Sequence, residues 1–214
     1  ILDDHHMTVE GYLAKLGKDP MIEVTATMGV ADLLEPVLEK SEVNVLILDV
    51  TVPISSENRN SYPILHVIPT LLDEHPNLNI LVVSMRVERA LIRGVMDAGA
   101  NGYILKDDQN ANLNFLEIVK LVAEGGVYLS EEAGKVYDKQ LEKENGKQIS
   151  PRQLEALSLC AAYPGDKSML LATKMHITHS AFRNLLSGAY IKLGARNRTE
   201  AIAKAKQMGL ITPD

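Results

Sequence analysis

The stretch VNVLILDV, residues 43–50, decides the fold, because it is an almost wholly apolar run that ends beside a carboxylate, Asp49. A short run of this kind is typical of a strand buried on both faces of a parallel sheet. Three further apolar runs end in polar residues: ILDD at 1–4, NILVVSM at 79–85 and GYILKD at 102–107. In a parallel α/β sheet, every strand delivers its carboxyl end to one edge, where ligands bind. We therefore expect the polar residues at these strand ends to meet in one pocket: Asp3, Asp4, Asp49, Ser84 and Lys106.

Strand-like runs alternate with helical patterns through the first 126 residues. The strand-like runs cover residues 1–2, 22–27, 45–49, 80–83 and 102–105. The helical patterns cover residues 8–16, 30–39, 64–75, 87–98 and 113–124. Five β/α repeats predict a doubly wound, five-stranded parallel sheet with helices on both faces. Only two residues precede Asp3, so we expect a few residues of the first strand to be missing from the start of this sequence.

The composition changes after Gly125-Gly126, which ends the last of these helical patterns. Residues 127–148 are rich in charge and in helix formers, and we expect a helical linker there. Residues 149–214 form a second unit, which opens with the helix cap Ser150 and with Pro151 at the first helical position. Short helical patterns predict a small all-α domain, with helices at residues 151–162, 167–173, 178–193 and 199–208.

The net charge of −6 hides a division between the two units. Residues 1–149 carry 13 basic and 24 acidic side chains, whereas residues 150–214 carry 9 basic and 4 acidic ones. An acidic front with a basic tail indicates that only the tail meets nucleic acid. Apolar runs stay well short of the ~20 residues that span a membrane, and the single cysteine fits a reducing compartment. We expect a cytoplasmic protein without a membrane partner.

The polar strand ends predict a specific chemistry. The carboxylates of Asp3, Asp4 and Asp49 repel one another unless a cation lies among them, and oxygen ligands suit Mg²⁺. A lysine and a hydroxyl in the same pocket can hold the oxygens of a phosphoryl group. This arrangement favours a site that makes and keeps an aspartyl phosphate. His5 and His6 adjoin the acidic pair and leave a transition-metal site open, although we favour the simpler interpretation that they begin the first helix.

The motifs ILDDHH, ILDVTVP, VVSM and AGANGYILKD, in this order and spacing, resemble the receiver domain of bacterial two-component response regulators. The resemblance covers residues 1–126 and implies a flavodoxin-like fold. It implies that Asp49 is the phospho-acceptor and also a metal ligand. It further implies that Asp4 binds Mg²⁺ directly, that Asp3 acts largely through water, and that the carbonyl group of Thr51 is another ligand.

The same resemblance assigns the residues that sense the phosphoryl group. Ser84 corresponds to the hydroxyl that moves toward it, and Lys106 to the lysine that pairs with it. Tyr103 corresponds to the aromatic switch residue. One departure is the loop ISSENRNSYP at residues 54–63, which is longer and more polar than usual. This loop could alter access for a kinase, but we favour a solvated insertion.

The segments ISPRQLEALSLCAA at 149–162 and ITHSAFRNLLSGAYIKLGARNRTEAIAKAKQMGLI at 177–211 resemble the LuxR-type helix-turn-helix domain. Together with a receiver, this is the NarL/FixJ arrangement. The second helix of such a motif enters the major groove, and here it would begin after Thr178. Arginine can read guanine bidentately, and asparagine can read adenine. The resemblance implies the following DNA contacts: Thr178, His179, Ser180, Arg183, Asn184 and Ser187 on this helix, and Lys174 and Lys192 beside it.

The tail departs from the usual pattern where DNA would be read. The family commonly has a basic residue, a polar residue and then a histidine in the middle of this helix, but this chain has Arg183, Asn184 and Leu185. Gly188 replaces a second basic residue and weakens the helix by roughly 1 kcal/mol relative to alanine. Fewer cations imply weaker DNA binding that depends less on salt.

The sequence therefore predicts a response regulator that accepts a phosphoryl group on Asp49 from a sensor histidine kinase. It would regulate transcription by binding DNA, as a homodimer when active, and catalyse only its own phosphoryl transfer and dephosphorylation. Two alternatives remain open: a tail that docks a protein instead of DNA, and regulation that does not depend on phosphorylation. A magnesium-dependent phosphohydrolase is disfavoured, because Thr51 stands where such an enzyme carries a second acidic residue.

Overall fold

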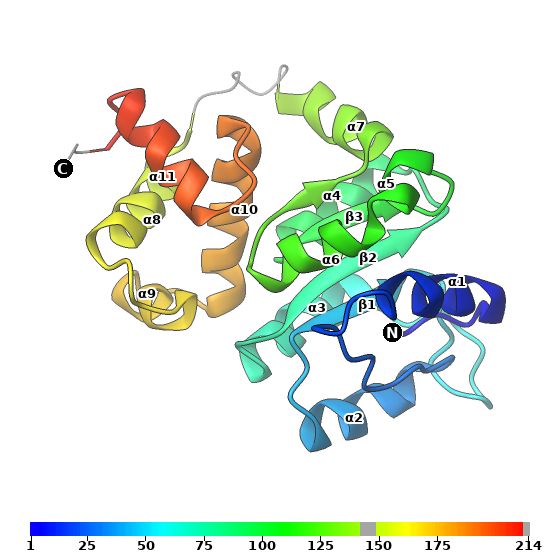
Figure 1. The fold of residues 1–214 in the computed structure, drawn as a ribbon. Helices are drawn as coiled ribbons and strands as arrows, with labels where there is room; N and C mark the ends of the chain where they lie inside the picture. Colours follow the sequence, from blue (N-terminus) through cyan, green and yellow to red (C-terminus); the bar gives the residue numbers. More distant parts are fainter. Residues whose placement is uncertain (142–148, 212–214) are drawn as a thin grey trace.

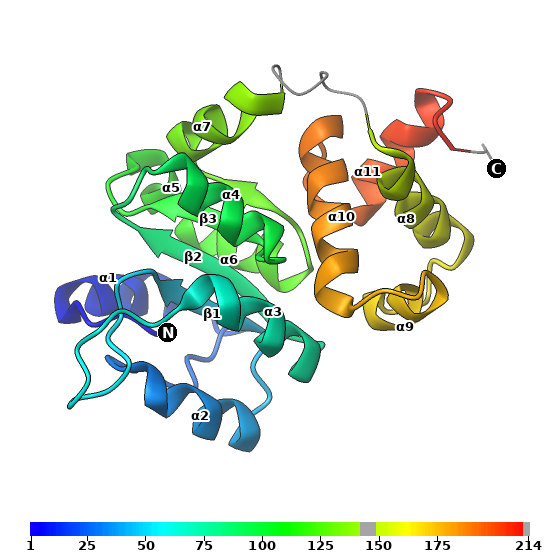
Figure 2. The ribbon, with the colours of Figure 1, turned by 180° about the vertical axis from the view of Figure 1, so that it is seen from behind.

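The computed structural model describes residues 1–141 and 149–211. Figure 1 shows an α/β unit and a helical unit that lies against one end of it, and Figure 2 shows the same arrangement from behind. In both views α10 (His179–Leu193) is the helix of the second unit that faces the first. The predicted division into an α/β part and an all-α part is thus visible in the structure.

The α/β unit is built on a parallel sheet in the order β1-β2-β3-β4. Its core consists of the predicted apolar runs, and all six residues of β2 are buried. Asp49 is in register with Val83, so β1 and β2 end side by side. The strands are β1 (Val45–Asp49), β2 (Asn79–Ser84), β3 (Gly102–Leu105) and β4 (Tyr128–Leu129).

The prediction of five strands is wrong, because the described residues form a sheet of four. The first run supplies only Leu2, which forms isolated parallel bridges to Leu48 and to Met28. Residues 22–27 do not form a strand, and residues 22–26 instead line a cavity of about 660 Å³. Among the described residues, this edge of the sheet has isolated bridges at Leu2 in place of a fifth strand. The unexpected strand is β4, which pairs with β3 at the other edge.

The bridge at Leu2 nevertheless holds the start of the chain in the sheet. Its amide donates to the carbonyl oxygen of Ile47 at 2.8 Å, and its carbonyl oxygen accepts from the amide of Asp49 at 2.8 Å. The amide of Asp3 donates to the carbonyl oxygen of Met28 at 3.0 Å. These bonds continue the parallel ladder, so Asp3 and Asp49 leave the sheet at the same edge.

Helices cover both faces of the sheet. On one face, Tyr12 of α1 stacks on Phe115 of α6 with ring centroids 4.7 Å apart, and both pack with Ile47 and Leu81. The opposite face packs against α2, α3 and α4. The helices of this unit are α1 (His6–Leu16), a short 3-10 turn (Ala31–Leu33), α2 (Leu34–Lys40), α3 (Ile64–Glu74), α4 (Arg89–Asp97), α5 (Gln109–Leu113), α6 (Phe115–Ala123) and α7 (Glu131–Leu141).

The first part of the expected linker packs with the sheet. The amide of Ser130 donates to the carbonyl oxygen of Tyr103 at 3.0 Å, and its hydroxyl accepts from the amide of Leu105 at 3.1 Å. Ala133 of α7 is fully buried. Residues 142–148 of the expected linker lie outside the described residues.

The helical unit has the expected caps. Ser150 and Gln153 form a reciprocal capping box at the start of α8, and the hydroxyl of Thr178 accepts from the amide of Ala181 at the start of α10. Cys160 is fully buried, and burial raises the pKa of its thiol to about 11, in keeping with a packing role. The four helices are α8 (Pro151–Ala162), α9 (Ser168–Lys174), α10 and α11 (Arg198–Gln207). None of the helices in the described ranges is both long and apolar enough to cross a membrane.

Candidate functional site

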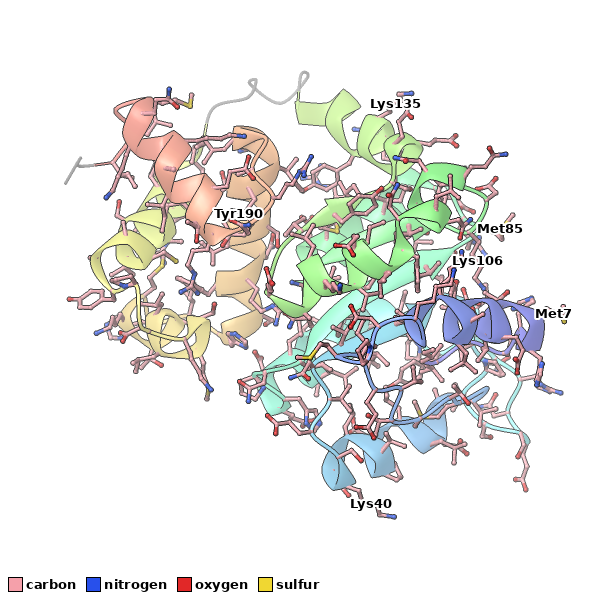
Figure 3. All side chains as sticks on the ribbon, in the orientation of Figure 1. Met7, Lys40, Met85, Lys106, Lys135 and Tyr190 are labelled. Atoms are coloured by element: carbon pink, nitrogen blue, oxygen red, sulfur yellow. The ribbon has the colours of Figure 1, made fainter. Side chains whose placement is uncertain are left out.

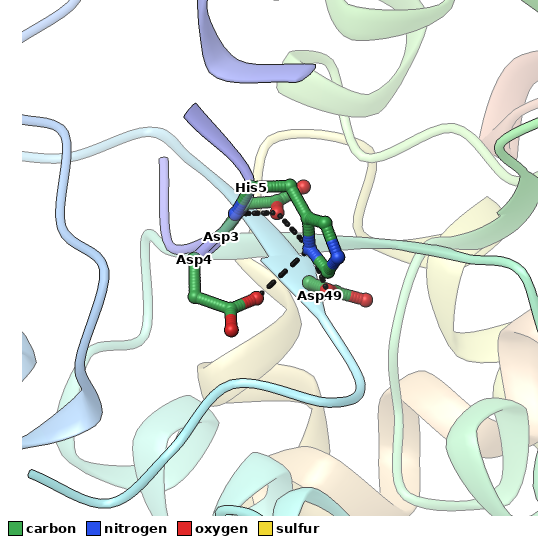
Figure 4. Close-up of side chains that lie close together, drawn as sticks. All are labelled: Asp3, Asp4, His5 and Asp49. Atoms are coloured by element: carbon green, nitrogen blue, oxygen red, sulfur yellow. Dashed lines mark hydrogen bonds and ion pairs between the residues drawn. The ribbon is translucent and has the colours of Figure 1, made fainter. Parts of the chain in front are cut away.

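The predicted pocket forms at the carboxyl ends of the central strands. Asp49 ends β1 and Asp3 follows the bridge at Leu2, and both residues are almost fully buried at 2% and 4% exposure. Asp4 lies at the rim and is open to solvent. Figure 4 shows the three carboxylates around one small space, together with the ring of His5. Two buried carboxylates beside a third are unfavourable unless positive charge or hydrogen-bond donors face them.

Lys106 supplies part of that positive charge. Its Nζ lies 2.8 Å from Oδ2 of Asp3 and 3.1 Å from Oδ2 of Asp49. Its backbone is fixed on both sides, since its amide donates to the carbonyl oxygen of Ser84 and its carbonyl oxygen accepts from Asn112. One ammonium group does not balance three carboxylates, so the pocket retains a negative charge that suits a divalent cation.

His5 also faces this pocket. Its Nδ1 lies 2.9 Å from Oδ1 of Asp4, 3.3 Å from Oδ1 of Asp3 and 3.8 Å from Oδ2 of Asp49. Ligand atoms of these four residues all lie within 4.8 Å of one another. His5 is indeed the residue before α1, as expected, but its side chain forms no capping bond and turns to the carboxylates instead. The residues present therefore fit a bound divalent cation.

The residues predicted to sense a phosphoryl group lie around this pocket. The hydroxyl of Thr51 donates to Oδ2 of Asp49 at 3.0 Å. The hydroxyl of Ser84 accepts from the amide of Arg86 at 3.1 Å. Tyr103 is fully buried, and its hydroxyl donates to the carbonyl oxygen of Arg86 at 2.7 Å. Burial raises the pKa of Tyr103, so its phenol keeps its proton. The Thr51 carbonyl as a metal ligand stays a prediction.

The long loop after β1 folds back on itself. Pro53 and Ser61 form an antiparallel bridge, and the tip of the loop between them is exposed. The amides of Ala31 and Asp32 donate to the carbonyl oxygens of Pro53 and Ile54, each at 2.9 Å. The loop thus caps the 3-10 turn before α2.

The surface predicted to read DNA is covered in this structure. The first residues of α10, which were predicted to contact DNA, are not exposed, because the α/β unit lies against them. Nδ1 of His179 is 3.0 Å from the carbonyl oxygen of Leu72, and the amide of Ser180 donates to Oδ1 of Asp73 at 3.0 Å. Both His179 and Ser180 are 7% exposed. Burial lowers the pKa of His179.

Arg183 makes the most extensive of these contacts. Its guanidinium donates to the carbonyl oxygen of Leu78 at 2.6 Å, to the side-chain oxygen of Asn79 at 3.1 Å and to that of Asn101. Burial lowers the pKa of Arg183 to about 10, which still leaves it charged at neutral pH. The residues that join the two units in this way are called the docking contact: Leu72, Asp73, Leu78, Asn79 and Asn101 on one side, and His179, Ser180 and Arg183 on the other.

The residues of the α/β unit that form the docking contact were not predicted from the sequence. Asn79 and Asn101 are polar residues buried at the beginning of strands, at 9% and 4% exposure. Asn101 also accepts from the amide of Ile80 and donates to the carbonyl oxygen of Gly126. The signal in the sequence was an asparagine directly before each of two predicted strands. A cleft of about 680 Å³ lies beside the contact, with Arg183 in its wall.

Three other predicted DNA contacts are buried or have local partners. Ser187 is buried, at 6% exposure. Nζ of Lys192 donates to Oε1 of Gln153 at 3.1 Å, and Nζ of Lys174 lies 4.2 Å from the ring centre of Tyr163.

One of the two departures from the family pattern has a packing explanation, because Leu185 packs against the apolar core. A Cβ atom at Gly188 would come within 2.5 Å of Nε2 of Gln153, the end of a flexible side chain, so glycine is not required there by the backbone packing.

No model of a known protein family matches this chain. DegU of Brevibacillus brevis, a transcriptional regulatory protein, is 24% identical over 99% of this chain and 93% of its own length. The DNA-binding transcriptional activator DevR/DosR of Mycobacterium tuberculosis is 26% identical over 97% and 93%. NarP of Escherichia coli, a nitrate/nitrite response regulator, is 23% identical over 94% and 90%.

Solved structures show the same two-unit fold. The Salmonella typhimurium RcsB response regulator superimposes with a TM-score of 0.56 at 22% identity, covering 96% of both chains. A structure of an RcsB–DNA complex gives a TM-score of 0.56 and covers 96% of this chain and 95% of that one.

Proposed function

We propose that this chain, whose homologues are transcriptional regulators of the NarL/FixJ type, is a response regulator that binds DNA under the control of an aspartyl phosphate. The observation that carries this proposal is the pocket itself. Asp49 is buried at the end of β1, between the ammonium group of Lys106 and the carboxylates of Asp3 and Asp4. A carboxylate held in this way is a nucleophile placed where a phosphoryl group can be neutralised and retained.

Each residue has a part in the phosphoryl transfer. Asp49 attacks the phosphorus atom, and the donor leaves with its electron pair. Lys106 offsets the negative charge that would otherwise keep two anions apart. A bound Mg²⁺ would add further positive charge, held by Asp3, Asp4, Asp49 and the carbonyl group of Thr51. The chain would catalyse only this transfer and the later hydrolysis, with a sensor histidine kinase as the donor.

A phosphoryl group on Asp49 would reach the hydroxyl of Ser84, which ends the neighbouring strand. Ser84 and Tyr103 both bond to the backbone of Arg86, so a shift of one changes the environment of the other. The same strand, β2, begins at Asn79, which holds Arg183. We infer that phosphorylation weakens the docking contact through this strand and through α4 beside it. Such a switch needs a difference of only a few kcal/mol between two states.

Release of the docking contact would expose the residues that read DNA. Arg183 cannot bond to Leu78 and to a guanine base at the same time, so docking and reading exclude each other. Once free, α10 would enter the major groove with Arg183 and Asn184 facing the bases. RcsB is solved as dimers on DNA, and we propose a dimer for the active form of this chain as well.

Two alternatives predict other results. A tail that binds a protein instead of DNA is favoured by Leu185 and Gly188, which replace the usual polar and basic residues. A phosphohydrolase would need a second acidic residue two positions after Asp49, where Thr51 offers a hydroxyl group instead. Selection of bound DNA sequences, with and without acetyl phosphate, separates DNA reading from protein docking. A defined sequence enriched after phosphorylation supports the proposal, whereas no enrichment in either condition favours protein docking.

A further inference from the structure

The ring of His5 takes part in the acidic pocket, which was not expected of a residue that merely precedes a helix. Its Nδ1 comes closer to Asp4 than Lys106 comes to Asp49, at 2.9 Å against 3.1 Å. The amide of His5 also donates to Oδ1 of Asp3 at 2.9 Å, which fixes the backbone in this position. Figure 4 shows the ring beside the carboxylates of Asp3, Asp4 and Asp49.

Lys106 and His5 approach Asp3 from different sides. Lys106 contacts Oδ2 of Asp3, while Nδ1 of His5 lies nearest to Oδ1. Figure 3 places Lys106 beside α1, well apart from Tyr190 of the helical unit. The side chain of His5 is 62% exposed and that of Asp4 is 33% exposed, so an ion can reach this side of the pocket from solvent. The histidine therefore lies at the open mouth, and the lysine closes the other side.

We propose that Nδ1 of His5 is a nitrogen ligand of the cation in this pocket and makes the site prefer a divalent transition metal such as Mn²⁺ to Mg²⁺. Mg²⁺ takes oxygen ligands almost exclusively, whereas imidazole nitrogen suits first-row transition metals. A set of three carboxylates with one imidazole is a donor set for the latter. This proposal rests on the proposed function, because it concerns the cation that would assist phosphorylation of Asp49.

The neighbouring histidine provides a matched control. The side chain of His6 is 85% exposed, and its Nε2 lies 3.9 Å from Glu10, away from the pocket. The two residues are adjacent in sequence and have the same chemistry, but only His5 faces the carboxylates. His75 is a second control, because it lies near Glu35 and Glu74 in a separate cluster that could also bind a metal ion.

The test uses the full chain with substoichiometric Mn²⁺. Electron spin-echo envelope modulation detects coupling between bound Mn²⁺ and an imidazole nitrogen. We expect this coupling in the parent protein, in His6→Ala and in His75→Ala, and its loss in His5→Ala. Calorimetry should show that His5→Ala weakens Mn²⁺ binding at least about tenfold, the low end of the cost of losing even an outer-shell partner. Mg²⁺ binding should change less than about twofold, since Mg²⁺ prefers oxygen ligands.

The possible results are distinct. Mn²⁺ that binds in the parent without nitrogen coupling, or with coupling that survives in His5→Ala, overturns the role of His5 but leaves the phosphorylation pocket intact. If Asp4→Ala also leaves Mn²⁺ and Mg²⁺ binding unchanged, the cation does not occupy this pocket, and that part of the proposed function fails as well. Because His5 is exposed and makes no capping bond, His5→Ala is expected to fold like the parent.

Discussion

The guanidinium of Arg183 donates a hydrogen bond to the carbonyl oxygen of Leu78 at 2.6 Å. Arg183 lies on the helix proposed to read DNA, and Leu78 lies directly before β2. That strand has six residues and ends at Ser84, beside the acidic pocket. At about 3.3 Å per residue it spans roughly 17 Å. A single buried strand thus joins the proposed site of phosphorylation to the residue proposed to read a base.

Removing one carboxylate from the docking contact should increase DNA binding by the unphosphorylated protein. Asp73 is exposed and accepts from the amide of Ser180, so Asp73→Ala should weaken docking without harming the core. A hydrogen bond of this kind contributes about 1 kcal/mol, which corresponds to a roughly fivefold gain in DNA affinity. Fluorescence anisotropy with labelled DNA measures the gain. Glu74→Ala, at the same helix end, is the matched control, and an equal gain from it would show that only charge repulsion from DNA matters.

Arg183 should be required for specific recognition once the tail is free. Arg183→Ala in the phosphorylated protein should cost about 1–3 kcal/mol on the selected sequence and relax specificity at one base position. Lys174→Ala should instead weaken all sequences alike and reduce the salt slope by about 1. Salt titrations with selected and random DNA measure both effects. If both variants match the parent, the tail is not a DNA reader.

Acid should loosen the docking contact. Burial lowers the pKa of His179 in the docked state, while Asp73 and Arg183 are the charged groups nearby. The docked form therefore binds fewer protons than the undocked one. Docking is complete above the ordinary histidine pKa of about 6.5 and is weakened as the pH falls through and below it.

This pH dependence can be followed at one amide. Hydrogen exchange of the Ser180 amide, corrected for its intrinsic rate, should show less protection near pH 5.5 than near pH 7.5, a range in which histidine changes charge. His179→Gln keeps a donor that does not titrate and should flatten the curve. An equal slope in His179→Gln would assign the effect to another group.

Cation binding should depend on the acidic pair. Asp4 lies at the mouth of the pocket, whereas Asp97 pairs with Arg93 on α4, away from it. Asp4→Ala should therefore weaken Mg²⁺ binding at least about tenfold, because it removes a direct ligand. Asp97→Ala should leave it unchanged. Equal losses measured by calorimetry would place the cation elsewhere.

The pocket was predictable from sequence because its geometry follows from strand ends. Asp49 and Lys106 each close an apolar run, and parallel pairing brings such ends together whatever the loops do. The sheet edges were not predictable in the same way. At one edge, Leu2 alone forms bridges to the sheet. At the other edge, Tyr128–Leu129 is too short a strand to show an alternating pattern.

The position of α10 could not be read from its own sequence. The face that carries Arg183 is polar, as a DNA-reading face should be, and the same polarity suits a contact with the amides of Asn79 and Asn101. Whether this face meets DNA or the α/β unit depends on the shape of the α/β unit, which the sequence of α10 does not contain. His5 shows a related limit, since its place before α1 was predictable but the direction of its ring was not.

The central claim is that phosphorylation of Asp49 releases α10 from the α/β unit. Its most direct test is amide exchange at Ser180, measured with and without acetyl phosphate and a divalent cation, alongside intact mass spectrometry. The account predicts one labile phosphoryl adduct with a loss of protection at Ser180, and neither change in Asp49→Asn. An adduct that persists in Asp49→Asn, or an adduct on Asp49 that leaves Ser180 fully protected, would contradict it.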